Sequence, residues 1–214
     1  MRPQKLAVGG VLFLCTLAAW TQTARDTPST PEERQRAVRL TRKLEQTPLG
    51  PEASEDRDWL NKWIIEIPDL TVPVCDELLK PLLAGEGSQY RYSKELVSQQ
   101  LAGEMAYLIE HPQEAKPESQ DDFAINKAGM ESALNAYDAI VKSGAKGARW
   151  GPLEEMAKKR KAGQLDDFVR SATLKCLTGE TVTASLRFHP STRKDGACWE
   201  PRLPACVVVQ GHIR

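Results

Sequence analysis

The chain has 214 residues, of which 41% are hydrophobic, and its 29 basic and 29 acidic side chains give a formal net charge of zero at pH 7. This length can bury the core of one domain or of two small ones. Residues 25–186 carry 22 basic and 27 acidic side chains, and this mildly acidic body gives no electrostatic reason to bind nucleic acid or an anionic membrane surface, so we expect neither.

The first 24 residues have the layout of a secretory signal. They begin with the basic residues Arg2 and Lys5, continue through an uncharged stretch from Leu6 to Trp20, and end in a short polar segment. An export machine reads such a segment and a peptidase removes it. We therefore expect a mature chain that begins near Arg25, has a net charge of −2, and is secreted or periplasmic.

Two other interpretations of this N-terminus are open. An uncleaved anchor would have to cross the bilayer with an apolar stretch of about 15 residues, whereas a spanning helix needs about 20. A lipoprotein signal would acylate Cys15, but Leu14 stands where a small residue is expected. No later apolar run reaches membrane-spanning length, so we expect no membrane span after cleavage.

Helical spacing of apolar residues dominates the chain from Thr30 to Leu177. It predicts an all-α fold, a compact bundle or array of about six to seven helices. Thr30 and Glu33 form a capping box around Pro31, which predicts a first helix over 31–46. Further helices are expected over 54–65, 73–84, 93–110 and 121–142, then a short one from Pro152 and a seventh that carries Leu165 and Cys176.

Two segments divide this helical pattern. Residues 112–120 are polar, hold two prolines and show no periodicity, so they mark a possible subdivision of the helical domain over 25–177. In residues 178–214, alternation from Val182 to Phe188 is typical of a strand, which predicts a short β-hairpin or an irregular tail. The helix over 121–142 also has a face of small residues that favours close approach of another helix.

Four cysteines remain after signal removal: Cys75, Cys176, Cys198 and Cys206. An even number outside the cytoplasm favours disulfides, and four cysteines allow three pairings. Cys75 and Cys176 each lie on the apolar stripe of a predicted helix, whereas Cys198 and Cys206 are close together in the tail. This arrangement favours Cys75 with Cys176 and Cys198 with Cys206. The alternative is that the cysteines of the two stripes are unpaired and buried.

Candidate chemistry is sparse. The sequence contains no zinc-protease, nucleophile-elbow, phosphate-loop or Cys-x-x-Cys motif, and the cysteine and histidine spacing does not suit a metal site. We therefore predict no catalytic residue, no cofactor and no metal. His111 is expected to cap a helix C-terminus, and the acidic pairs fall in first helical turns, where the helix dipole favours negative charge.

Aromatic residues supply the remaining candidates for a site. Trp59 and Trp63 continue an apolar stripe and are interpreted as core. Tyr90 and Tyr92 follow a glycine loop and are harder to place in a core, which makes them the candidate contacts for a ligand or partner.

The sequence therefore predicts an exported helical protein that binds an unknown protein or small-molecule ligand and is not an enzyme. A hydrolase with an acid/base site assembled by the fold, and a purely structural envelope component, are the alternatives.

Overall fold

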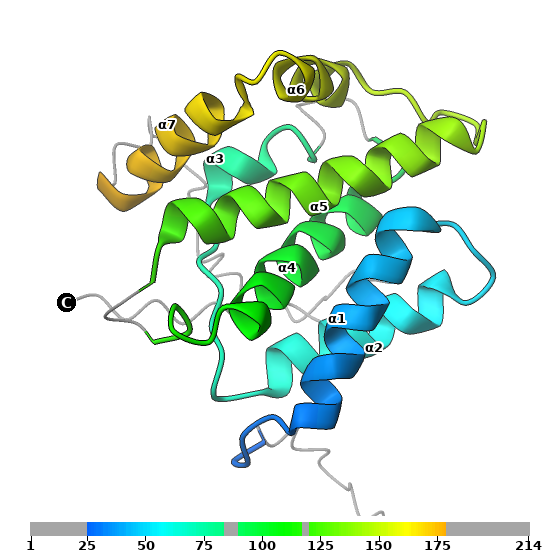
Figure 1. The fold of residues 1–214 in the computed structure, drawn as a ribbon. Helices are drawn as coiled ribbons and strands as arrows, with labels where there is room; N and C mark the ends of the chain where they lie inside the picture. Colours follow the sequence, from blue (N-terminus) through cyan, green and yellow to red (C-terminus); the bar gives the residue numbers. More distant parts are fainter. Residues whose placement is uncertain (1–24, 84–89, 117–119, 179–214) are drawn as a thin grey trace, which may run out of the picture. The chain divides into compact units, whose positions relative to one another are not determined.

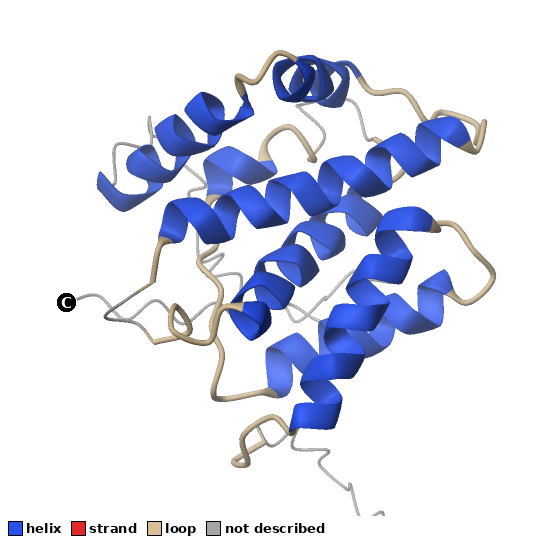
Figure 2. Cartoon of the chain, in the orientation of Figure 1, coloured by secondary structure: helices blue, strands red, loops and turns tan. Residues whose placement is uncertain are grey.

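The computed structural model describes residues 25–83, 90–116 and 120–178, which belong to one compact unit. Within them the chain forms seven α-helices and no strand, so the predicted all-α fold is confirmed (Figures 1 and 2). The helices are α1 (Pro31–Gln46), α2 (Ala53–Glu66), α3 (Asp76–Leu79), α4 (Ser93–Glu110), α5 (Asp122–Lys142), α6 (Gly151–Lys161) and α7 (Leu165–Thr178). The predicted signal segment, and the tail from residue 179 with Cys198 and Cys206, lie outside the described residues.

Helix α1 begins at the predicted capping box. The Glu33 backbone N–H donates to Thr30 Oγ1 at 3.2 Å, and the Thr30 backbone N–H donates to the Glu33 carboxylate at 2.8 Å. The Arg25 guanidinium donates to both Glu33 oxygens, at 2.7 and 3.0 Å. These hydrogen bonds, that of Arg25 first, lower the pKa of Glu33 to about 2. The start of the helix is therefore fixed by two hydrogen bonds and an ion pair.

Helix α3 is much shorter than the predicted helix over 73–84. It spans only Asp76–Leu79, and the chain then continues as turns through Leu83. Pro81 explains why the helix ends early, because proline has no backbone N–H and its ring clashes with the carbonyl four residues earlier. The apolar periodicity of this segment was real, since Leu78 and Leu82 are both buried, but it does not require a continuous helix.

Helix α5 is the central element of the fold. In Figure 1 it lies between α4 and α1 on one side and α6 and α7 on the other, and it contacts all four helices. One hydrophobic cluster joins α5 to α3, α6 and α7, and a second joins α1 and α2 to α4. Helix α4 contributes to both clusters, through Leu96 to the first and Met105 to the second. The extensive α4–α5 packing spans the 112–120 segment, so the described residues on its two sides share one unit.

Two glycines set the separation of α4 and α5. A Cβ atom at Gly103 of α4 would lie 2.4 Å from the Cβ of Ser132, and one at Gly129 of α5 would lie 2.5 Å from the Cγ of Glu104. Both distances are far below ordinary carbon contact, so neither position accepts a side chain unless the neighbouring side chain moves. The small-residue face expected on the fifth helix is therefore the face on which α4 packs.

Candidate functional site

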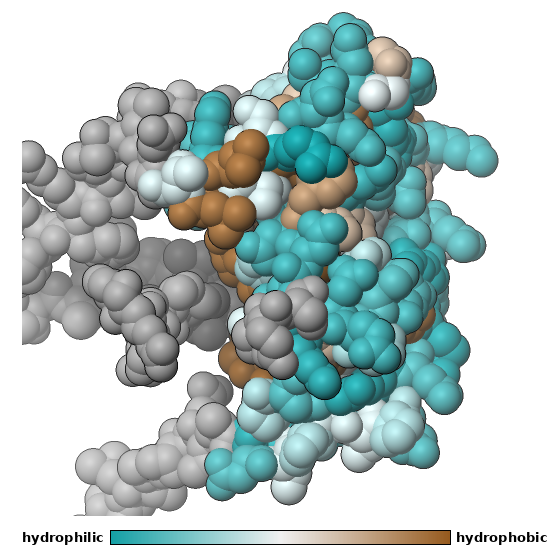
Figure 3. All heavy atoms as spheres, turned by 60° about the vertical axis from the view of Figure 1, so that its left-hand side comes forward, coloured by the Kyte–Doolittle hydropathy of each residue, from teal (hydrophilic) through white to brown (hydrophobic). Residues whose placement is uncertain are grey.

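An open groove lies where the start of α5 meets the C-terminal half of α7. Its volume is about 320 Å³, and its lining combines apolar and charged side chains: Gln120, Asp121, Asp122, Phe123, Arg170, Thr173, Leu174 and Leu177. Figure 3 brings this side of the molecule forward and shows apolar side chains gathered beside hydrophilic ones. Leu174 and Leu177 are 55% and 63% exposed and lie three residues apart, so they are neighbours on the surface of α7. The groove therefore presents apolar side chains to the surface.

The acidic edge of the groove is part of the N-terminal cap of α5. Asp121 Oδ1 accepts hydrogen bonds from the backbone N–H groups of Phe123 at 3.1 Å and Ala124 at 3.2 Å. Asp122 is the first residue of the helix. Burial and the charge of Asp121 raise the pKa of Asp122, because both disfavour its ionised form. The groove thus holds two neighbouring carboxyl groups, one of them without a cationic neighbour that lowers its pKa.

A cation already present at the groove belongs to α7. The Cζ atom of Arg170 lies 4.1 Å from the centroid of the Phe123 ring, which is the geometry of a cation–π contact. This contact joins α7 to the first turn of α5 over the apolar part of the groove. The side chain of Arg170 is exposed, so its charge also faces solvent.

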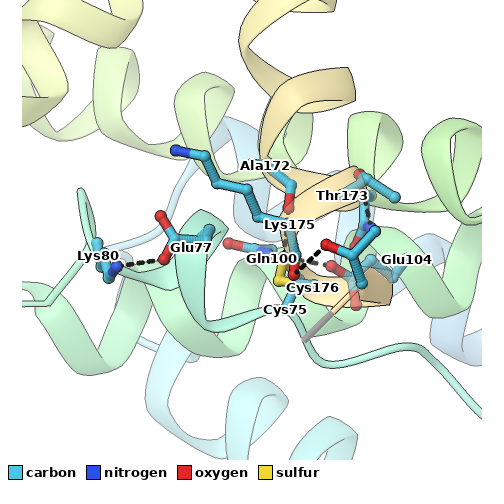
Figure 4. Close-up of a disulfide and its surroundings, with 11 residues drawn as sticks. Cys75, Glu77, Lys80, Gln100, Glu104, Ala172, Thr173, Lys175 and Cys176 are labelled. Atoms are coloured by element: carbon cyan, nitrogen blue, oxygen red, sulfur yellow. Dashed lines mark hydrogen bonds and ion pairs between the residues drawn. A yellow bond between two sulfur atoms is a disulfide. The ribbon is translucent and has the colours of Figure 1, made fainter. Parts of the chain in front are cut away.

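Two further interactions fix α7 in place beneath the groove. Asn126 Nδ2 of α5 donates to Thr173 Oγ1 at 3.1 Å, and Thr173 itself lines the groove. Cys176 forms a disulfide with Cys75, whose Cα atoms are 5.7 Å apart (Figure 4). This is the pairing that the helical stripes predicted, and it ties α7 to the start of α3. Cys75 Sγ also lies 3.6 Å from the Ala172 carbonyl oxygen, a sulfur–oxygen contact and not a hydrogen bond, because a disulfide sulfur carries no proton.

Tyr90 and Tyr92, the candidate contact residues, lie in the first hydrophobic cluster. They are 4% and 7% exposed, and their hydroxyl groups donate to the backbone carbonyls of Ala148 at 2.7 Å and Lys146 at 3.0 Å. The Tyr90 ring also stacks on Trp150, with centroids 5.5 Å apart. These positions explain both tyrosines as packing residues, because each buries its ring and satisfies its hydroxyl group.

Trp59, Trp63, His111 and two basic residues of α6 make contacts within the fold. Trp63 is buried and stacks on Trp59, with ring centroids 5.8 Å apart. His111 caps α4: its Nδ1 lies 2.9 Å from the Tyr107 carbonyl oxygen, and its ring stacks on that of Tyr107. Two of the basic residues that end α6 form ion pairs: Lys158 contacts Glu155 at 2.6 Å, and Arg160 contacts Glu131 at 3.7 Å.

Sequence reasoning missed a layer of buried polar side chains between α1, α4 and α5. Gln99 Nε2 donates to the Thr41 carbonyl at 3.1 Å and to Ser132 Oγ at 2.8 Å, and Ser132 Oγ donates to Glu45 at 2.7 Å. Glu104 lies in the same α4–α5 interface and is 0% exposed. The sequence held one signal of this burial: Glu104 stands among the small residues Ala102, Gly103 and Ala106. Small side chains let a neighbouring helix pack closely, and close packing leaves little room for water around a charged group.

Glu104 is fully buried and forms no ion pair among the described residues. Burial raises its pKa to about 8, against the opposing effect of a hydrogen bond from Gln100 Nε2 at 3.1 Å. Its second oxygen, Oε2, has no hydrogen-bond partner among the described residues, and neither has Gln100 Oε1 or Asn126 Oδ1. The side chain does not reach the surface, so it does not contribute to the groove lining.

Comparison with protein-family models, with curated proteins and with solved structures finds no match to this chain. Within the described ranges, no group of three or more histidine, cysteine or acidic side chains is placed to hold a metal ion. The helices of those ranges are also too short or too polar to cross a bilayer.

Proposed function

We propose that this chain is an exported, non-enzymatic binding module, and that the groove between α5 and α7 accepts a segment of a partner protein with apolar side chains and a basic group. The observation that carries the proposal is the exposure of Leu174 and Leu177 on one stretch of α7, beside Phe123. Burial of such side chains against a partner is favourable by about 25 cal/mol for each Å² removed from water.

The charges at the groove favour a basic group on the partner. Asp121 and Asp122 line the groove. Burial and the charge of Asp121 raise the pKa of Asp122, so both disfavour its ionised form. A cation placed beside these carboxylates would stabilise the ionised form. Arg170 is already engaged with the Phe123 ring. A second hollow of about 240 Å³, lined by 46–50, Ala139 and Ser143, offers no ionisable side chain and gives no comparable basis for recognition.

Binding also agrees better than hydrolysis with the positions of the candidate acid and base. A hydrolase would bring His111 together with an acid of raised pKa in a cleft. His111 instead stacks on Tyr107, and Glu104 is enclosed within the α4–α5 interface. Neither residue lines the groove.

Export is supported by the order of charge, apolar residues and polar residues in the first 24 positions. The Cys75–Cys176 disulfide agrees with it, because disulfides persist in oxidising compartments such as the periplasm and the extracellular space. We place the mature chain in one of these compartments.

The binding proposal can be tested with a defined peptide and the mature chain over residues 25–214, so that any cover the chain itself supplies is present. A fluorescently labelled peptide of three leucines and two lysines is the probe. The same peptide with two glutamates in place of the lysines is the control for charge. The test variant is Leu174→Ser with Leu177→Ser. The matched control is Ile65→Ser on α2, because Ile65 is 69% exposed and lies outside the groove.

Fluorescence anisotropy should show that the lysine peptide binds the wild type and the Ile65→Ser variant equally. The leucine double variant should bind it at least about tenfold more weakly, since two apolar contacts of about 1 kcal/mol or more are lost. Equal binding to all three proteins, or a preference for the glutamate peptide, would overturn the proposed recognition by this groove.

A further inference from the structure

The contact between α4 and α5 encloses an acid that has no counter-ion. Glu104 is 0% exposed, and its Cγ lies where a Cβ atom at Gly129 would be only 2.5 Å away. The same added atom would lie 2.9 Å from the Gln100 backbone carbonyl oxygen. Water and a second side chain are therefore both excluded at this point of the interface, and the carboxyl group faces protein atoms on α5.

Three buried side-chain oxygens on α4 and α5 receive no hydrogen bond from the described residues. Gln100 Oε1 and Asn126 Oδ1 are buried acceptors without a hydrogen-bond partner among the described residues, and Glu104 Oε2 is in the same position. A carboxylate would add a further acceptor and a buried charge. A neutral carboxylic acid instead carries no charge and has one O–H donor in place of one of its acceptor sites. The chemistry of the interface therefore favours the protonated form.

We propose that the α4–α5 contact at Glu104 is a proton-dependent latch, in which the two helices pack closely with Glu104 as a neutral carboxylic acid and separate more readily when it ionises. The close approach at Gly129 gives the latch its mechanical basis, because an ionised carboxylate could be hydrated only if the helices moved apart. Helix α5 also carries Phe123 and, through Asn126, holds Thr173 of α7. The latch therefore acts on the same helix that forms one side of the groove.

The groups around Glu104 do not supply a compensating charge. Gly129 on α5 is uncharged, and α2 meets α4 through the neutral pair Asn61 and Ser98 and through the attraction of Arg57 to Glu95. On α1, Glu45 accepts a hydrogen bond from Ser132, and the cation Arg42 forms ion pairs with Glu45 and with Glu110 of α4. Figure 4 shows the charged side chains near the disulfide: Glu77 and Lys80 pair with one another, and Lys175 extends from α7. Burial is the cause of the raised pKa of Glu104, the Gln100 hydrogen bond opposes it, and no ion pair with Glu104 occurs in the described residues.

The test uses the mature chain over residues 25–214 and compares the wild type with Glu104→Gln, which has nearly the shape of the neutral acid. Glu55→Gln is the control, because Glu55 is an exposed residue of α2. Urea unfolding of each protein is measured from pH 5 to pH 9. Infrared spectroscopy of the wild type with isotopically labelled glutamate provides a second measurement, since a protonated carboxyl group and a carboxylate absorb at well-separated frequencies.

Between pH 5 and 8, the unfolding equilibrium constant of the wild type should rise by up to about tenfold per pH unit relative to Glu104→Gln, because only the folded state holds the proton. Glu55→Gln should follow the wild type. The labelled wild type should show one protonated carboxyl group at pH 7 that disappears above about pH 9. Parallel pH profiles for the wild type and Glu104→Gln would overturn the proposal. If Glu104→Gln fails to fold, a spectrum without a protonated carboxyl at pH 7 would do the same.

Discussion

Gly129 of α5 and Glu104 of α4 are packed so closely that a Cβ atom at Gly129 would lie 2.5 Å from Glu104 Cγ. The helix interior would normally favour alanine over glycine by about 1 kcal/mol. At this position the loss of close packing outweighs that preference, since the atoms met by the new methyl group belong to a fully buried side chain.

We predict that Gly129→Ala lowers the free energy of unfolding by about 1–3 kcal/mol, the usual cost of overpacking an interface. Urea denaturation measures the change. Gly151→Ala is the matched control, because a Cβ atom there meets no atom within 4 Å and the residue begins α6. If the two variants had equal stability, α4 and α5 would not be as tightly packed as the structure indicates.

The ion pair at the start of α1 predicts an acid-dependent loss of stability. The folded-state pKa of Glu33, about 2, lies below its ordinary value of 4.5, so its contribution is present above pH 4.5. Protonation then removes that contribution as the pH falls from about 4.5 to about 2. Glu33→Gln should show a shallower loss of stability over this range than the wild type. Identical acid profiles would show that Arg25 does not hold Glu33 in solution.

Removal of the Cys75–Cys176 disulfide should destabilise the fold. Replacing both cysteines by alanine frees a loop whose ends are 101 residues apart, and loss of a native disulfide typically costs about 2–5 kcal/mol. Denaturation of the double variant against the wild type measures this cost. Peptide mapping without reductant identifies the link directly, and a bond from Cys75 to Cys198 or Cys206 would contradict the pairing.

The helical domain should fold without most of the C-terminal tail. Among the described residues, the last buried member of the hydrophobic cluster around α5 is Ala172, and Cys176 packs against the cluster. A chain that ends near Ser185 should therefore give a strongly helical circular dichroism spectrum and a cooperative thermal transition. An aggregated or non-cooperative product would mean that the residues removed supply part of the core.

Export should remove the N-terminal segment between about Trp20 and Asp26, because the basic start, apolar middle and polar end are the features that a signal peptidase system recognises. N-terminal sequencing of the protein from the extracytoplasmic fraction identifies the cut. Recovery of chains that retain Met1 in the membrane fraction would replace cleavage with anchoring.

Local signals made part of this fold predictable from the sequence. Helices α1 and α4 begin and end where they were predicted, α1 because of its capping box and α4 because His111 and Pro112 end it. The error at α3 came from following the apolar spacing through Pro81, although proline interrupts the hydrogen bonds of a helix interior. Periodicity identifies buried positions there, but it does not establish the backbone that carries them.

The candidate site was harder to predict because its residues are set by tertiary packing. Tyr90 and Tyr92 precede α4 and belong to no helix, so no helical periodicity marks them as buried. Their hydroxyl groups donate to backbone carbonyls more than 50 positions away, which a local pattern cannot predict. Glu104 is buried because α4 has neighbours on opposite sides, whereas its apolar stripe predicted one covered face. Leu174 and Leu177 flank Cys176 on a predicted helix, and their exposure could be known only from the position of α7.

The bond between Cys75 and Cys176 also changes how the protein should respond to proteases. Helices α3 to α6 and most of α7 lie between the two cysteines in the sequence. A single cut anywhere in that stretch would leave both fragments covalently joined, so nicked protein would migrate as one species on a denaturing gel until it is reduced. In a compartment that contains proteases, this arrangement keeps α7 and the groove attached to the rest of the chain after an initial cleavage.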